Sequence, residues 1–330
     1  MTAFGLDSRP VNTSCVAPLV PPTGQPGDPF PATLLATGCV DPQDATKPAP
    51  GLIPYDVRSP LWSDGADKQR WLALPEGGHI HINLDGDWDF PIGTVLVKSF
   101  SLGGKHIETR LLVRHADGAW AGYSYEWNDA ETDATLLGGT KVKQVGTQYW
   151  MYPSSSQCLD CHLPASGFTL GLETAQLNRE LVYPNGKTAN ELATLDHVGM
   201  FDAPLGAPVA ELPALPVPSQ DGPLEPRARS YLHANCSICH RPGGTMKAAI
   251  DFRYATPFAT TATCNVAPMQ GTLGIPGAVI LFPGDPTRSL INIRMKGTGG
   301  SRMPPLASSI VHADGVALLD AWVSSLTTCP

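Results

Sequence analysis

The sequence predicts an α+β protein in which an antiparallel β-sheet or barrel precedes a mainly α-helical unit. Short runs of alternating apolar and polar residues, separated by turn residues, fill positions 51–151 and are typical of strands. Seven prolines crowd between 202 and 226, which indicates a semi-rigid linker. Amphipathic helical spacing then marks both ends of 227–330. We therefore expect an extended segment, a β domain, a linker and a helical domain, over 1–50, 51–201, 202–226 and 227–330.

The N-terminal half supplies the predicted strands. Residues 1–50 are rich in proline and glycine without sustained periodicity, so we expect an extended segment there. The clearest strand patterns follow at 78–83, 93–100, 108–114, 120–127 and 141–145. Six tryptophans are expected to supply much of the core of this sheet, namely Trp62, Trp71, Trp88, Trp120, Trp127 and Trp150.

The predicted helices come later in the chain. Helical apolar spacing appears at 170–181 and 188–197, and again in a longer amphipathic stretch that opens at 227–235. Asp285, with the proline after it, predicts the start of a short helix. The last helix is expected to begin with Asp314 as its N-cap. Its apolar face would hold Val316, Leu319, Val323 and Leu326.

Composition and charge limit the possible partners. The net charge of −8 argues against binding to nucleic acid or to an anionic membrane surface. No run of eighteen apolar residues occurs, so no membrane span is expected. The 33 glycines and 33 prolines predict many turns and long irregular connections.

Two short motifs indicate the chemistry, Cys158-Leu-Asp-Cys161-His162 and Cys236-Ser-Ile-Cys239-His240. In each, two thiols three residues apart can add to the vinyl groups of a haem, and the following imidazole can bind the iron. A thioredoxin-like dithiol or half of a zinc site would also use paired cysteines, but neither explains a histidine after the second cysteine in both places. The sequence thus predicts two covalently bound haem c groups, with His162 and His240 as axial ligands.

The remaining cysteines bear on the cellular compartment. Haem is attached through thioethers outside the cytoplasm, yet residues 1–7 have neither a basic region nor an apolar one. We therefore expect an exported protein, periplasmic or extracellular, whose export signal has been removed. Four further cysteines are left, and an even number in an exported protein favours disulfides over free thiols. Of three possible pairings, Cys15–Cys39 with Cys264–Cys329 keeps each bridge inside one predicted domain.

The helical domain resembles class I cytochrome c over 227–330, because a helix ends in the second motif and an amphipathic helix closes the chain. Between them, the turn Gly-Ser-Arg-Met303-Pro-Pro-Leu is similar to the distal-ligand loop of that family. The resemblance implies Met303 as the sixth ligand opposite His240, with Met295 as the alternative ligand. A role for Met303 in filling the core is the less favoured interpretation. A soft thioether favours ferrous iron. A long insert around Cys264 departs from the family pattern.

The β domain is similar to the β-fold family of hydroxylamine-oxidising c-type cytochromes, and to the cytochrome c′-beta proteins that share its scaffold. The similarity lies in the strand Phe-Pro-Ile-Gly-Thr-Val-Leu-Val-Lys98 followed by the first motif, within 88–162. It implies that Lys98 is covalently tied to the haem as a catalytic residue and that the position opposite His162 is open to a small ligand. On its own, Lys98 is better explained as a strand lysine facing solvent.

Other readings of the first haem and of the polar clusters stay open. The iron opposite His162 would be six-coordinate if His197, or Met200 just after it, were its distal ligand. The carboxylates of 85–89 could hold calcium, although a hairpin turn explains them better. His79 and His81 alternate onto one strand face, where an exposed edge is the simpler interpretation.

Taken whole, the chain resembles a family of uncharacterised bacterial periplasmic di-haem c-type cytochromes, through stretches at 5–10, 54–66 and 192–197. The resemblance brings no settled activity with it, and our first hypothesis is that the chain passes single electrons between other periplasmic redox proteins. A first alternative is a haem redox enzyme that acts on hydroxylamine, nitric oxide or peroxide at the first haem, with the second haem as electron relay. A second alternative is self-assembly, with the chain as subunit of a haem-stacked assembly.

Overall fold

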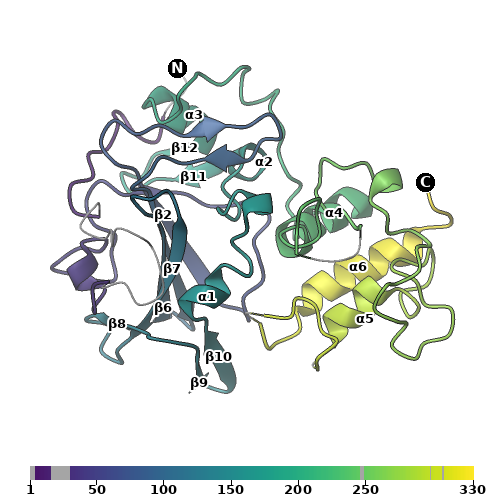
Figure 1. Cartoon of the computed structure of the whole chain (residues 1–330). Helices are drawn as coiled ribbons and strands as arrows, with labels where there is room; N and C mark the ends of the chain where they lie inside the picture. Colours follow the sequence, from purple (N-terminus) through teal and green to yellow (C-terminus); the bar gives the residue numbers. More distant parts are fainter. Residues whose placement is uncertain (1–3, 16–29, 246–248, 298, 307) are drawn as a thin grey trace.

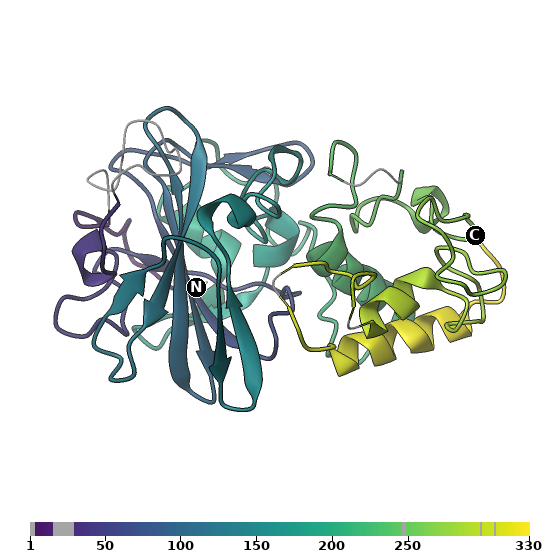
Figure 2. The same ribbon diagram turned by 60° about the horizontal axis from the view of Figure 1, so that its bottom comes forward.

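The computed structural model describes residues 4–15, 30–245, 249–297, 299–306 and 308–330. It combines helices with antiparallel sheets, which confirms the predicted α+β class. A β-rich part, drawn in purple to teal, lies beside a helical part drawn in green to yellow (Figure 1). The turned view shows the same side-by-side arrangement (Figure 2). Among the described residues, none of the helices has the length and apolar character that crossing a bilayer requires.

The β-rich part is built on a six-stranded sheet in which every neighbouring pair is antiparallel. Alternate residues of its strands face opposite sides, so each strand contributes to two different clusters. In spatial order the strands are β1 (Ile53–Pro54), β2 (Asp67–Ala73), β5 (Val95–Leu102), β6 (Lys105–Arg114), β7 (Trp120–Trp127) and β8 (Ala134–Leu136).

One face of the sheet is covered by the N-terminal segment. Val95 and Val97 of β5 share an apolar cluster with Leu34 and with the disulfide between Cys15 and Cys39. The segment around η2 (Leu35–Thr37) is therefore part of the packed core and is not simply an extended segment. The rest of the predicted extended segment, residues 1–3 and 16–29, lies outside the described residues.

The opposite face packs against short helices and a hairpin. Leu96 of β5 and Leu112 of β6 share a cluster with residues of these elements. The elements are β3 (His81–Ile82), β4 (Trp88–Asp89), α2 (Thr174–Leu177) and α3 (Glu191–His197), and the hairpin of β11 (Glu180–Val182) and β12 (Thr188–Asn190) lies between the last two in the chain. A third hairpin, β9 (Lys141–Val145) with β10 (Gln148–Tyr152), leads to α1 (Ser155–Cys158).

The helix predicted over 170–181 is wrong for most of its length, since only α2 is helical there. Asn178 leaves the helical conformation, and its side-chain amide donates to the carbonyls of Val209 and Leu212 at 2.8 and 3.1 Å. The chain then pairs in the β11–β12 hairpin. These contacts also correct the predicted linker over 202–226, because this stretch is fastened to the β-rich part and buries Leu215.

The helical part is organised by the close approach of two helices. It contains α4 (Leu224–Cys236), α5 (Leu290–Lys296) and α6 (Ala313–Ser325). A side chain at Gly315 of α6 would lie 2.5 Å from the Tyr231 ring of α4, so glycine permits this packing. The disulfide Cys264–Cys329 ties the chain's end to the long insert, which confirms both predicted pairings.

Several details of the helical prediction change. No helix begins at Asp285, whose carboxylate instead accepts from the Thr287 amide in a turn at 2.9 Å. The helix starts five residues later, as α5. Asp314 lies in the first turn of α6, while His312 occupies the N-cap. Five of the six tryptophans predicted for the core are buried, but Trp62 is only half-buried.

Trp62 and Asp64 join the two parts of the chain. The Trp62 amide donates to Asn235 Oδ1 at 2.8 Å, and its indole N–H donates to the Ile310 carbonyl at 3.0 Å. The buried Asp64 carboxylate accepts from the backbone amides of Ser309 and Ile310 at 2.7 and 2.9 Å. Since these amides belong to the loop before α6, one short segment holds the helical part against the sheet.

We expect Asp64→Asn to lower the free energy of unfolding by about 2 kcal/mol, because hydrogen bonds to a charged acceptor are stronger than those to an amide. Asparagine also tolerates the left-handed backbone of this position, where φ is +50°, so the change isolates the charge. Urea unfolding measures the effect. The exposed Asp67 provides the control, and equal losses for Asp64→Asn and Asp67→Asn would contradict the role of Asp64 as a clamp.

Candidate functional site

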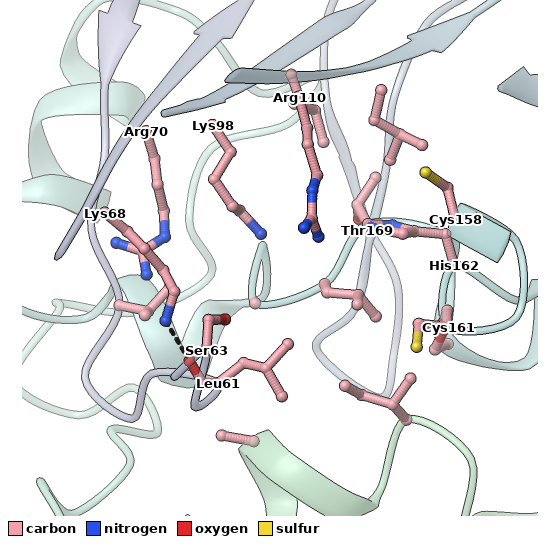
Figure 3. Close-up of a pocket in the computed structure, with 18 of the residues that line it drawn as sticks. Leu61, Ser63, Lys68, Arg70, Lys98, Arg110, Cys158, Cys161, His162 and Thr169 are labelled. Carbon is pink, nitrogen blue, oxygen red and sulfur yellow. Dashed lines mark hydrogen bonds between the residues drawn. The ribbon is translucent and has the colours of Figure 1, made fainter. Parts of the chain in front are cut away.

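A cavity lies between the six-stranded sheet and α4, and the first cysteine motif forms part of its wall. The volume it encloses is about 140 Å³, and it opens to solvent. Basic side chains from the sheet extend into it, with Cys158, Cys161 and His162 at one side (Figure 3). Leu96 and Leu112 add an apolar patch to the wall. The cavity therefore combines thiols, an imidazole, cations and apolar surface.

The first motif is positioned by α1 and by the neighbouring strand β7. Ser154 and Gln157 form a capping box that starts the helix one turn before Cys158. Cys158 is buried against Gly122 of β7, where an added Cβ would lie only 2.6 Å from the sulfur. A glycine at this point of the strand thus makes room for Cys158. Cys158 and Cys161 are both free thiols.

His162 has the tautomer and charge of a metal-binding imidazole. Its Nδ1 lies 2.5 Å from the Phe168 carbonyl oxygen, to which it donates. The Nε2 atom is then left with its lone pair. Burial, followed by the charge of Lys98, lowers the pKa of His162 to about 3, so the ring is neutral. A neutral imidazole fixed through Nδ1 is the form that binds iron, so these residues fit a haem.

The second motif follows directly from α4, which ends at Cys236. Cys236 and Cys239 are free, and the Nδ1 of His240 is buried without a hydrogen-bond partner among the described residues. Burial, followed by the charge of Arg294, lowers the pKa of His240. Met303 donates its amide to the Arg294 carbonyl at 3.1 Å. The backbone of Met303 is thus fastened to α5, and Met295 packs against the helical core.

The two motifs meet at the junction of the two parts. The Cys239 sulfur lies 3.9 Å from the carbonyl oxygen of Asp160, which sits between the cysteines of the first motif. Arg241, the residue directly after the second motif, donates to the Ala165 carbonyl at 2.8 Å and pairs with Asp87 at 3.0 Å. Ile238, inside the second motif, lines the cavity of the first. Each motif thus forms part of the other's surroundings.

Other predicted ligands lie elsewhere. His197 is exposed at the end of α3 and stacks on Phe4 at 3.8 Å between ring centroids, so it does not reach the cavity. Met200 is buried in the apolar cluster and does not line the cavity either. His79 is exposed, and His81 is also exposed and pairs with Asp202 at 2.7 Å. The distal ligand expected from His197 or Met200 is therefore not brought to His162.

The predicted calcium cluster is a hairpin turn. The Asp87 amide donates to Asp85 Oδ1 at 3.2 Å between β3 and β4, and the Asp87 carboxylate is taken by Arg241. In the part of the chain that the structure describes, no three histidine, cysteine or acidic side chains gather as an ion site. Calcium therefore has no support here.

The structure adds three cationic residues to Lys98 in the cavity. Lys68 and Arg70 come from β2 and Arg110 comes from β6, and all three line the same wall as Lys98 (Figure 3). The sequence prediction missed Lys68 and Arg70 because it did not identify β2 as a strand, and it placed Arg110 in a strand without relating it to Lys98. Residues two positions apart lie on the same face of a strand, as 68 and 70 do and as 108 and 110 do. This spacing could have identified the cations from the sequence.

No known protein family, curated protein or solved structure matches this chain. Its function is therefore inferred from the geometry of its own residues.

The buried lysines of the cavity predict a pH dependence of stability. Burial, followed by the charges of Arg70 and Arg110, lowers the pKa of Lys68 to about 7 from 10.5. Between these two pH values the unfolded chain binds more protons, so the free energy of unfolding should rise with pH across this window. Lys68→Met should remove part of the rise, on the order of 2 kcal/mol.

Urea unfolding near pH 7 and near pH 10 measures this difference. The exposed Lys105 on β6 supplies the control, because Lys105→Met should keep the full rise. An identical pH dependence of wild type and Lys68→Met would show that Lys68 is hydrated in the folded protein.

Proposed function

We propose that this chain is a periplasmic di-haem c-type cytochrome that passes single electrons between other redox proteins. The observation that carries the proposal is the division of the eight cysteines. Four form two disulfides, while the four of the Cys-x-x-Cys-His motifs stay free. Thiols kept free in a chain that otherwise forms disulfides indicate a covalent partner other than sulfur.

The residues of each motif have separate roles in the proposal. Cys158 and Cys161 would hold the first haem through thioethers and His162 would bind its iron, while Cys236, Cys239 and His240 would do the same for the second. A haem iron supplies a one-electron couple when bound. The Phe168 carbonyl fixes the orientation of His162. Met303, whose amide donates to the Arg294 carbonyl, stays the proposed sixth ligand of the second iron.

Contact between the motifs supports electron exchange within one chain. Cys239 touches the Asp160 carbonyl, and Arg241 ties the same region to Ala165. Because these contacts join the two attachment segments directly, groups bound to them would be neighbours rather than isolated carriers. The two disulfides support an exported location, which we propose to be the periplasm.

A second candidate function is a haem redox enzyme acting on hydroxylamine, nitric oxide or peroxide at the first haem. It is favoured by one observation, that neither His197 nor Met200 lines the cavity beside His162 while Lys98 does. A position without a protein ligand is where a small molecule binds iron. Lys98 as a residue cross-linked to haem belongs to this candidate. Steady-state turnover of hydroxylamine or peroxide with an artificial redox partner separates the enzyme from the carrier.

Intact mass under denaturing conditions tests the main proposal. We expect the purified protein to carry two haem masses and the Cys236→Ser/Cys239→Ser double variant to carry one, since thioethers survive denaturation. The double variant Cys15→Ser/Cys39→Ser is the control, because it removes the same number of sulfurs and should keep both haems. A colourless wild-type protein without added mass would refute the proposal.

Gly122→Ala should reduce haem attachment at the first motif only. The added methyl carbon would meet the Cys158 sulfur at 2.6 Å and push it from its position beside β7. Gly138→Ala is the matched control, since nothing lies within 4 Å of its added carbon. We expect a mixture of one-haem and two-haem molecules for Gly122→Ala in the same mass measurement, and only two-haem molecules for Gly138→Ala. Full attachment in both would contradict the proposed role of Gly122.

A further inference from the structure

Three cations stand directly opposite one another on neighbouring strands. In the registers of the sheet, Arg70 of β2 faces Lys98 of β5, and Lys98 faces Arg110 of β6. All three side chains line the cavity rather than the solvent-facing surface. Like charges in directly opposite positions destabilise a sheet, so this row needs negative charge nearby.

The two outer members of the row have their own counter-charges. Arg70 pairs with Asp56 at 2.5 Å. Arg110 makes two hydrogen bonds to the buried Glu108, at 2.8 and 2.7 Å. The Trp150 indole N–H also donates to Glu108, at 2.9 Å, and helps to fix it. Asp56 also pairs with Arg179, at 2.7 Å, so both carboxylates are already engaged by arginines.

Lys98, in the middle, has no hydrogen bond or ion pair with any of the described residues. Lys68, in the neighbouring position on β2, donates to the Leu61 carbonyl and has no carboxylate partner. On the opposite wall the carboxylates are also engaged, Asp87 by Arg241 and Glu173 by His233. Two positive charges of the cavity thus lack a counter-charge within the described chain.

We propose that Lys98, flanked by Arg70 and Arg110 and supported by Lys68, binds a small oxyanion or carboxylate inside the cavity. The row offers an ammonium group between two guanidinium groups, the donor types that proteins use for such anions. Burial, followed by the charges of Arg70 and Lys68, holds the pKa of Lys98 well below its ordinary value when no anion is present. An anion between the three side chains relieves this repulsion.

Two sources supply such an anion. One is a free inorganic oxyanion such as nitrite or sulfite, which enters through the open mouth of the cavity. The other is a propionate of the first haem, and only this source rests on the proposed function. Both present a carboxylate-like pair of oxygens to the same donors.

Calorimetric titration of the purified full chain with sodium nitrite and with sodium sulfite, at constant ionic strength, tests the free-anion source. Four proteins are compared: wild type, Lys98→Met, Lys98→Arg and Lys105→Met. Because a charge-assisted hydrogen bond is lost, we expect Lys98→Met to bind at least one anion roughly tenfold or more weakly than wild type. Lys98→Arg and the exposed control Lys105→Met should bind as wild type does.

Redox titration of the same four proteins between about pH 6 and pH 8 tests the propionate source. A propionate that loses its cation is protonated more readily, so the midpoint potential of one haem should become pH-dependent in Lys98→Met but not in Lys98→Arg. This result supports the proposal even where no free anion binds. Thermal unfolding shows whether each variant is folded.

The proposal is overturned if the haem potential of folded Lys98→Met stays independent of pH and, in addition, either the variant binds both anions as wild type does or neither protein binds an anion. A protein without haem would refute the proposed function but leave the anion titration valid, because its donors belong to the sheet. The two failures are therefore distinguishable.

Discussion

The register of three strands is the constraint on which the candidate site depends. Because side chains alternate along β5, Val95 and Val97 join the cluster under the N-terminal segment while Leu96 and Lys98 face the cavity. A shift of one residue would exchange the two sets and bury Lys98 in an apolar core. The packing that stabilises one face of the sheet thus also determines which charges line the cavity on the other.

A second constraint is the junction between the sheet and the helices. Trp62 and Asp64 hold the loop before α6, and Arg241 holds the first motif's region through Ala165. These contacts are polar and geometrically specific, unlike the apolar clusters that form each part's own core. They fix how the two cysteine motifs face one another. Groups attached to the two motifs would therefore be held in a fixed position relative to each other.

The sequence predicted what depends on local pattern and missed what depends on long-range contact. The alternation in 120–127 predicted β7. The even number of cysteines left outside the two motifs, together with the predicted domain bounds, predicted both disulfides. The helix over 170–181 failed because Asn178 is held by carbonyls more than thirty residues away. His197 was a reasonable ligand by distance along the chain, but its helix turns it toward Phe4. The row of cations appears only once the strand register is known.

The walls of the cavity restrict the chemistry of any guest. Leu96 and Leu112 favour a ligand with apolar surface, while Lys98 between its two arginines favours a ligand with negative charge. A ligand that suits both the apolar and the cationic walls is a largely apolar molecule with anionic groups at one edge. An apolar molecule bound together with a separate small anion would also suit them. A haem with its propionates meets the first description, and the free thiols beside the neutral imidazole of His162 meet its covalent requirements. The cationic row and the cysteine motif, which are separate features of the sequence, are thus both compatible with the haem proposed above.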